Sequence, residues 1–328
     1  MTEAVPALSM SWRVARASRR EGWNGEVIAV HGRTWYLTGD DAEIYAIVQE
    51  PIGNGPLNLV IREFTPPAVT PLSVGASVAS TGTHLLLGDS IDIVLDRATL
   101  WDPKAYLVKG ADPDEMRRSI PGLYRITPTC AHAHSLARLL PHLHEEALPA
   151  PLEAISHFPR SHALIAGLFE SLARRNRKAL KVVASSLAGF GPGVTPAGDD
   201  FLSGMLLALA FVQDHRPDGE LSQIATLLLE TAAPRTHEIS AAYMRAAHSG
   251  EASEPWHPLL SAIALGDTAN VRDAVERVLR IGETSGGDML AGFITALAAV
   301  HGDSPVAWQG LVQPAETRPA AETTPPAG

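Results

Sequence analysis

The sequence predicts an α+β protein in which a small N-terminal β barrel or sandwich precedes a mainly helical domain. Residues 26–95 contain short runs of β-branched and aromatic residues that are separated by glycine, proline and aspartate. Strands at this spacing are typical of a barrel or sandwich, rather than of strands that alternate with helices. From about residue 130, apolar residues recur at three- and four-residue intervals, which is typical of amphipathic helices.

We expect strands at 26–30, 33–37, 43–48, 57–62, 72–79, 84–87 and 91–95, with a tight turn at His31-Gly32 between the first two. Helices are predicted at 131–140, 161–174, 176–188, 199–213, 219–232, 237–248, 256–265, 268–280 and 286–300. The predicted domains are an N-terminal arm (1–22), a β domain (23–110), a linker (111–129), an α-helical domain (130–305) and a disordered tail (306–328).

Composition excludes several classes of protein. Lys and Arg total 26 against 36 Asp and Glu, a net charge of −10, which argues against nucleic acid as the main partner. No apolar run is long enough for a membrane span. Residues 13–20 are basic, but no apolar stretch follows to form a signal peptide, so we expect a cytoplasmic protein. Cys130 is the only cysteine, which excludes intrachain disulfides and Cys-rich zinc sites.

Two loop-to-helix junctions in the helical half have matching sequences. Residues 191–204 read GPGVTPAGDDFLSG and residues 282–292 read GETSGGDMLAG. Aligning Asp200 with Asp288 gives a shared pattern, D-[FM]-L-[SA]-G-[MF]-[LI]-x-A-L-A, and a threonine precedes it in both copies. We interpret the pair as an internal pseudo-repeat within the helical domain.

Helix capping accounts for part of this pattern. Thr195 followed by Pro196 is typical of a helix start, and Ser285 with Asp288 matches a capping box. Capping does not explain Asp199 beside Asp200, since the residue that would cap this frame is Ala197.

Nor does capping explain the paired glycines inside the helices. Gly204 and Gly292 each cost about 1 kcal/mol relative to alanine in a helix interior. A glycine at the same place in both copies indicates a close approach of another helix or of a ligand. If the two helices have their N-termini at the same end, Asp199, Asp200 and Asp288 converge; antiparallel packing would separate them.

The glycine-rich loop at 189–198 can present backbone N–H groups to an anion at a helix N-terminus. It is not a Walker A loop, because no G-K-[ST] ends it. Acidic residues beside an anion leave three kinds of chemistry open. They can hold Mg²⁺ that bridges to an anionic substrate, bind a substrate amide or ammonium group, or act as acid and base.

Arg235, Thr236 and Ser240 begin another predicted helix with a threonine cap. They either form a third wall of the same pocket, with Arg235 on a carboxylate or phosphate, or belong to a capped surface helix with a solvated arginine. Four histidines, His132, His134, His142 and His144, resemble a metal cluster, but we interpret them as solvated or core residues because their spacing does not suit ligands.

The two junctions resemble the AllH-like family, long catalogued as a domain of unknown function. The patterns G-x-G-x-T-P-[SA]-G-D-D-x-L-x-G and G-x-T-S-G-x-D-x-L-x-G carry the resemblance, which extends over about 180–300 and includes Arg235, Thr236 and Ser240. In the first half, only 53–61 (GNGPLNLVI) looks similar. Ala197 stands where the family pattern leads us to expect serine, so no hydroxyl acts there.

The resemblance implies a subunit of oxamate carbamoyltransferase, in anaerobic allantoin (purine) catabolism, with AllG-like and FdrA-like subunits as partners. We expect the substrate to be a small anion of the carbamoyl phosphate or oxamate class. Alternatives are a non-catalytic structural or small-acid-sensing subunit and a stand-alone metal-dependent hydrolase or transferase. The candidate catalytic residues are Asp199, Asp200 and Asp288; the candidate substrate-binding residues are Gly191, Gly193, Thr195, Gly198, Arg235, Thr236, Ser240, Thr284, Ser285 and Gly286. Mg²⁺ is the candidate cofactor.

Overall fold

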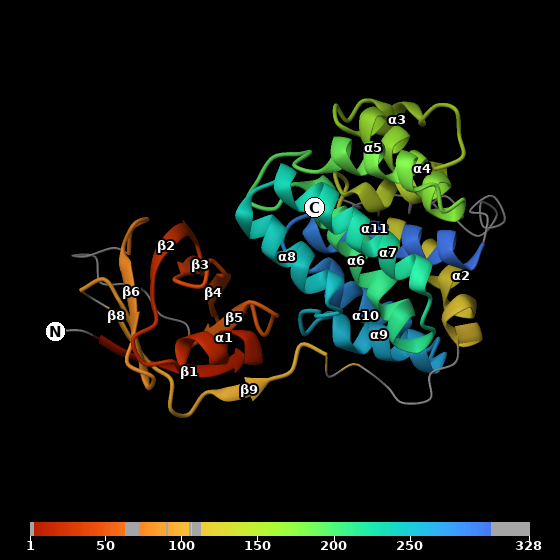
Figure 1. Ribbon diagram of the computed structural model, residues 1–328. Helices are drawn as coiled ribbons and strands as arrows, with labels where there is room; N and C mark the ends of the chain where they lie inside the picture. The colour runs from red at the N-terminus through yellow and green to blue at the C-terminus, as the bar shows by residue number, and fades with distance from the viewer. Residues whose placement is uncertain (1–2, 63–71, 90, 105, 107–112, 303–328) are drawn as a thin grey trace, which may run out of the picture.

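A β domain lies beside a helical domain in the computed structural model, which describes residues 3–62, 72–89, 91–104, 106 and 113–302 (Figure 1). Strands come first along the chain and helices dominate after residue 113, which confirms the predicted α+β class. No helix within these described ranges combines the length and apolar character that crossing a membrane requires.

The strands of the β domain form one sheet that closes on itself. They are β1 (Glu3–Ser11), β2 (Asn24–His31), β3 (Thr34–Gly39), β4 (Ile44–Gln49), β5 (Asn58–Ile61), β6 (Ser77–Ser80), β7 (His84–Leu87), β8 (Ile91–Val94) and β9 (Thr99–Trp101). Their order is β5-β4-β3-β2-β6-β7-β8-β1-β9. Because β1 also pairs with β5, the sheet is a barrel, and a short helix, α1 (Trp12–Ser18), follows β1.

Alternation along β3 and β4 gives these strands two buried faces. Trp35 and Leu37 on β3 point into the barrel core, as does Tyr45 on β4. Tyr36 and Ala46, which are paired across the two strands, belong instead to a cluster on the opposite face, outside the barrel. Side chains of a strand point alternately to its two faces, so the outer face must be covered by something other than the barrel.

The helical domain is built around two long, almost entirely buried helices, α6 (Ala197–His215) and α11 (Ser285–His301). Around them pack α2 (Pro113–Cys130), α3 (Ala150–Glu153), α4 (Phe158–Ala173), α5 (Arg177–Leu187), α7 (Gly219–Ala232), α8 (Glu238–His248), α9 (Trp256–Leu265) and α10 (Val271–Leu279). Two 3₁₀ helices, η1 (Leu136–His142) and η2 (Ala233–Arg235), complete it. Helices that are apolar on every side belong in a core.

Several elements differ from the sequence-based expectation. Part of the expected arm, 1–22, forms β1 and α1, and most of the expected linker, 111–129, lies within α2. Pro121 and Pro128 lie inside α2 and interrupt the pattern by which a helix is recognised. Only the second half of the predicted helix at 131–140 is helical, and it forms part of the 3₁₀ helix η1, which contains Pro141. The expected tail, 306–328, lies outside the described residues.

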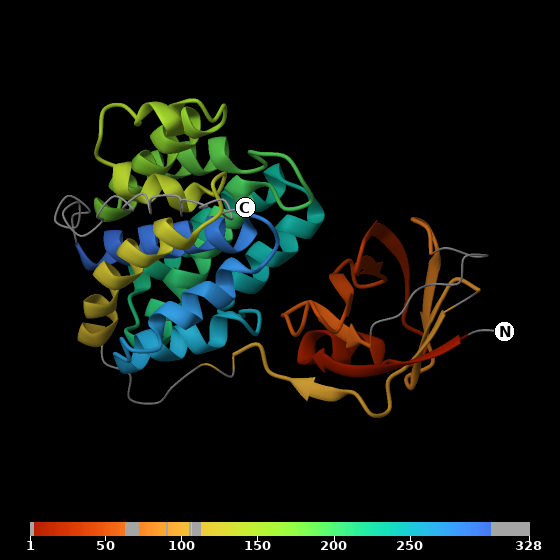
Figure 2. The same ribbon diagram turned by 180° about the vertical axis from the view of Figure 1, so that it is seen from behind.

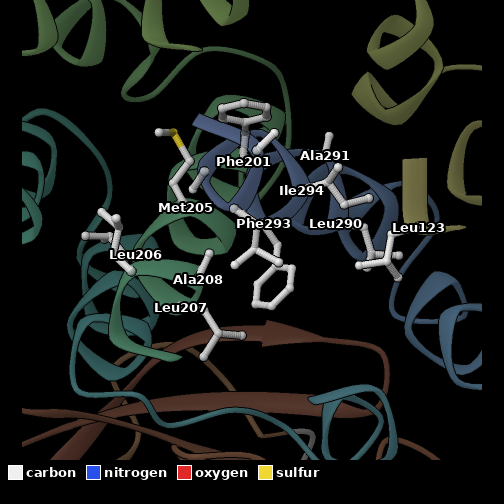
Figure 3. Close-up of a cluster of buried hydrophobic side chains, with 14 of the residues drawn as sticks. Leu123, Phe201, Met205, Leu206, Leu207, Ala208, Leu290, Ala291, Phe293 and Ile294 are labelled. Carbon is white, nitrogen blue, oxygen red and sulfur yellow. The ribbon is translucent and has the colours of Figure 1, made fainter. Parts of the chain in front are cut away.

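α6 and α11 cross in direct backbone contact at the paired glycines. A Cβ atom on Gly204 would lie 1.9 Å from the Met289 carbonyl oxygen, and one on Gly292 would lie 1.8 Å from that of Phe201. These contacts are reciprocal, because the sequence match aligns Gly204 with Gly292 and Phe201 with Met289. Figure 3 shows the large apolar side chains that surround this crossing. The glycines therefore serve helix–helix packing, the first of the two explanations that the sequence leaves open.

The domains touch along one side of the barrel, where α8 contacts β4 (Figure 1, Figure 2). Apart from apolar contacts, Arg13 donates to the Glu251 carboxylate at 3.0 Å. The backbone N–H of Glu254 donates to the Asn54 carbonyl at 3.0 Å, and the Asn54 side chain donates to the Glu254 carboxylate at 2.8 Å. Farther along, the rings of Trp101 and His257 stack with their centroids 5.0 Å apart.

We predict that Gly204→Ala or Gly292→Ala lowers the free energy of unfolding by about 1–3 kcal/mol or more, because the added methyl group forces the two backbones apart. Urea denaturation measures the change. Gly122→Ala is the matched control: its Cβ would meet nothing within 4 Å inside α2, so it should be neutral or stabilise by up to about 1 kcal/mol. Equal stability of Gly204→Ala and the wild type would contradict the close crossing.

Candidate functional site

The N-terminal ends of α6 and α11 meet. The hydroxyl oxygens of Thr195, just before α6, and Ser285, the first residue of α11, are 3.5 Å apart. Thr195 donates to Oδ2 of Asp200 at 3.3 Å, and the Ser285 hydroxyl also hydrogen-bonds this carboxyl group. The two helices thus begin at one place, and the arrangement in which antiparallel packing separates their starts does not occur.

Asp200 lies at the centre of this junction. Its side chain is buried, with 7% of the residue exposed. Burial raises its pKa well above the ordinary value for aspartate, and the charges of Asp288 and Asp199 raise the pKa further, while the hydroxyls of Ser285 and Thr195 lower it. A carboxyl group in such surroundings holds its proton more tightly than one in water. Asp200 can therefore act as a hydrogen-bond donor as well as an acceptor.

Asp199 points away from the junction, towards the glycine loop. Its Oδ1 accepts a hydrogen bond from the Gly189 backbone N–H at 2.7 Å, and its Oδ2 accepts one from the Thr236 hydroxyl. The side chain thereby joins the start of the loop to the start of α8. Both carboxylate oxygens of Asp199 accept hydrogen bonds from the protein, so this side chain has a structural role.

Asp288 points in a third direction, towards η1. Its Oδ1 accepts from the Ser135 hydroxyl at 2.9 Å and from the Leu136 backbone N–H at 2.6 Å. Burial raises the pKa of Asp288 to about 6, although hydrogen bonds from the Leu136 N–H and from the hydroxyls of Ser135 and Thr284 lower it. Geometrically, Oδ2 is buried without a hydrogen-bond partner among the described residues. The three acids thus surround the junction, but only Asp200 lies between the helix starts.

The helix-capping interpretation of the threonines and serine is wrong. The N-cap residues of α6, α11 and α8 are Pro196, Thr284 and His237, and none of them makes a side-chain capping bond. Thr195 and Thr236 each lie one residue too early to cap, and their hydroxyls bind carboxylates instead. Likewise, Asp288 does not return a bond to the backbone of Ser285, because its carboxylate is engaged by η1.

The glycine loop owes its shape to glycines with left-handed backbones. Gly189, Gly191 and Gly193 have φ of +71°, +117° and +102°, conformations that other residues rarely adopt. Gly198 differs, because its N–H donates to the Phe190 carbonyl and its Cβ would meet the Leu187 carbonyl oxygen at 2.1 Å. A close backbone approach, and not a contact with an anion, is therefore the observed reason for glycine at position 198.

Gly286 plays the same part in the second junction. Its N–H donates to the Ile281 carbonyl at 2.9 Å, and a Cβ there would lie 1.9 Å from the Val278 carbonyl oxygen. Thr284 lies just before α11, half-buried and close enough to Asp288 to influence its pKa. The hydroxyls of the second junction, and not its glycine N–H, are consequently the groups that face Asp200 and Asp288.

Arg235 and Ser240 have different environments. Arg235 is exposed, and its guanidinium donates to the Thr231 carbonyl at 2.6 Å. Ser240 is buried on α8 and donates to the Val194 carbonyl at 3.4 Å, which fixes the end of the glycine loop. The Arg235 guanidinium is therefore bound to the end of α7, whereas Ser240 supports the glycine loop.

Three residues near the junction are not identified by the sequence analysis. Ser135 binds Asp288 from η1, and the hydroxyls of Tyr36 on β3 and Tyr243 on α8 share a hydrogen bond near Asp200. Burial raises the pKa of both tyrosines, and the charge of Asp200 raises it further. The alternation of β3 predicts only that Tyr36 lies on the opposite face from Trp35. Nothing in the sequence places it against α8.

Within the described ranges, no group of three His, Cys, Asp or Glu side chains is arranged to hold a metal ion. The three acids are directed to three different partners, so they do not fit a shared Mg²⁺. The four histidines do not share one site either. His132 and His134 are in edge contact with their ring centroids 5.6 Å apart, whereas His142 pairs with Glu145 and His144 packs its ring against Phe169.

Residues 187–297 match the AllH family. The description of that family is oxamate carbamoyltransferase subunit AllH. The match confirms the resemblance that the two loop-to-helix patterns carry, and it extends from the last residue of α5 almost to the end of α11. It therefore includes the glycine loop, all three acids and the start of α8. No solved structure matches the chain.

Asp288 makes stability depend on pH in a defined direction. Its pKa is about 6 in the folded chain and 3.8 ordinarily, so the folded state binds the proton more tightly. Stability from this group is full below pH 4 and is lost as pH rises through 6. We predict that Asp288→Asn removes up to about 3 kcal/mol of pH dependence between pH 4 and 7, measured by urea unfolding against the wild type. Parallel pH profiles of the two proteins would contradict this assignment.

Proposed function

We propose that this chain is a subunit of an oxamate carbamoyltransferase-type complex and that it binds a small anionic substrate at the junction of α6 and α11. The observation that carries the proposal is the family match over 187–297, because the residues that meet at the junction all lie within it. In the proposed complex, AllG-like and FdrA-like subunits are the partners, and the pathway is the degradation of allantoin and other purine products.

Carbamoyl transfer of this kind joins the amide nitrogen of oxamate to the carbamoyl carbon of carbamoyl phosphate. The bond from that carbon to the phosphate oxygen breaks, inorganic phosphate leaves, and the nitrogen loses a proton. A site for this reaction needs neutral donors for carbonyl and carboxylate oxygens and an acceptor for the amide N–H. Thr195, Ser285 and Asp200 offer these functions together in buried surroundings.

We assign different roles to the three acids within this proposal. Asp200 orients the amide group of the substrate, because it lies between the two helix starts. Asp199 holds the glycine loop against α8, and Asp288 holds η1 against α11. The backbone of Gly191 and Gly193 and the hydroxyls of Thr195, Thr284 and Ser285 contribute the donors for the anionic end. No step is assigned to a metal ion, since the acids do not share a ligand position.

A non-catalytic, small-acid-sensing subunit is the second candidate. It is favoured by the full engagement of Asp199 by protein groups, which resembles a structural support more than a reacting group. Such a subunit would bind the same ligand at Asp200 without taking part in proton transfer. Activity of the assembled complex therefore distinguishes it from the catalytic candidate, whereas turnover by the chain alone would favour an independent transferase or hydrolase.

We predict that Asp200→Asn and Ser285→Ala each weaken oxamate or carbamoyl phosphate binding at least tenfold, about 1.4 kcal/mol, in isothermal titration calorimetry. The same Asp200→Asn variant should unfold at equal or higher urea concentration, because a buried carboxyl group in an unfavourable setting is replaced by a neutral amide.

Thr226→Ala is the control for loss of a hydroxyl, since Thr226 is exposed on α7 and bonds to nearby groups there and on α8. It should leave affinity unchanged. If Asp200→Asn and Asp288→Asn both retain full binding, and the reconstituted complex retains full activity, the proposed site is wrong. Weakened binding by Asp200→Asn together with full activity of the reconstituted complex would instead favour the sensing subunit.

A further inference from the structure

The outer face of the barrel packs directly against the elements that form the junction. One apolar cluster includes residues from both domains: Leu8, Ile28, Ala29, Tyr36, Ile44, Ala46, Val48, Leu57 and Val60 of the barrel, with Val194, Ile239, Ala242 and Tyr243 of the helical domain. Most of these side chains are buried, and the helical members come from the glycine loop and α8. The glycine loop and α8, which help to form the site, therefore cover the outer face of β3 and β4.

A polar contact lies within this apolar cluster. Tyr36 projects from β3 and its hydroxyl shares a hydrogen bond with that of Tyr243 on α8. Both tyrosines lie close enough to Asp200 for its charge to influence them. Tyr36 is thus a barrel residue whose hydroxyl lies in the neighbourhood of the central carboxyl group.

The glycine loop links the same cluster to the junction along the chain. Val194 packs in the cluster while its carbonyl accepts from Ser240 of α8. The next residue, Thr195, donates to Asp200 and lies 3.5 Å from the hydroxyl of Ser285. Val194, which is held between the barrel and α8, is therefore the neighbour in sequence of Thr195, which binds Asp200.

Polar contacts on the far side of the interface hold the barrel in this position. Glu251 is only 4% exposed and is paired with Arg13, so undocking would leave a carboxylate without its partner. Asn54 and Glu254 exchange backbone and side-chain hydrogen bonds. These residues lie away from Asp200, and they allow the docking to be changed without touching the site.

We propose that the β domain is a working part of the binding site: its docking holds the glycine loop and α8 in place, and Tyr36 is a positioning residue for Thr195 and Asp200. The ligand is the small anion of the proposed function, and only its identity rests on that proposal. The barrel's role is then to complete the site, in addition to any contact that it makes with other subunits.

Hydrogen–deuterium exchange of the full chain tests the positioning role without a ligand. Tyr36→Phe and Tyr243→Phe keep the ring and remove the shared hydrogen bond, so amides of 189–196 should exchange about two- to tenfold faster. Tyr45→Phe is the matched control, because Tyr45 lies on β4, points into the barrel core and donates to Asp41 at 2.7 Å. It removes a comparable hydroxyl and should leave exchange of the loop unchanged.

Asn54→Asp provides a second variant that is remote from the site. It places a carboxylate beside Glu254 and weakens docking by repulsion, so it too should accelerate exchange in 189–196. Thermal unfolding identifies any variant that has lost its fold. Unchanged loop exchange in Tyr36→Phe and in Asn54→Asp, with both proteins folded, would overturn the proposal.

Calorimetry with oxamate and carbamoyl phosphate then separates the two proposals. If the wild type binds, Tyr36→Phe should bind about two- to tenfold more weakly and Tyr45→Phe equally well. Equal affinity of Tyr36→Phe and the wild type would overturn the positioning role while leaving the proposed function intact. If the wild type binds neither compound, the proposed function fails, and the exchange experiment alone decides the role of the barrel.

Discussion

The backbone contact between α6 and α11 is the constraint on which the rest of the helical domain depends. Each helix places a glycine against a carbonyl group of the other, so the axes approach more closely than side chains would allow. This approach brings Thr195 and Ser285 together at the helix starts and buries Asp200 between them. Carboxyl groups are costly to bury, and here the hydroxyls of Thr195 and Ser285 offset part of that cost.

The three acids of the two junctions have different roles in the structure. Asp199 and Asp288 each receive two hydrogen bonds and join the central helices to α8, the glycine loop and η1. Asp200 is held by the hydroxyls of Thr195 and Ser285, and the charges of Asp199 and Asp288 act on it. Rigid outer acids therefore maintain the position of a central one whose proton is tightly held.

Much of this fold could be predicted because its signals are local. The spacing of apolar residues located α9, α11 and the hairpin around Gly32 closely. α2 was missed because prolines interrupt it, and β1 because its pairing with β5 and β8 is long-range. Within the site, the motif identified the acids, but their partners Ser135 and Thr236 and the nearby Tyr36 are brought to them by packing between distant segments. Capping rules, which consider only neighbours along the chain, assigned the hydroxyls of Thr195, Thr236 and Ser285 wrongly.

The reciprocal glycine contact also limits how the two helices can diverge in evolution. Gly204 faces the backbone of α11 and Gly292 faces that of α6, so a compensating change of side chain cannot make room for either substitution. The two positions must be retained together or lost together. Descendants that lost them would have more widely separated helices, and the meeting of Thr195 with Ser285 would be lost at the same time.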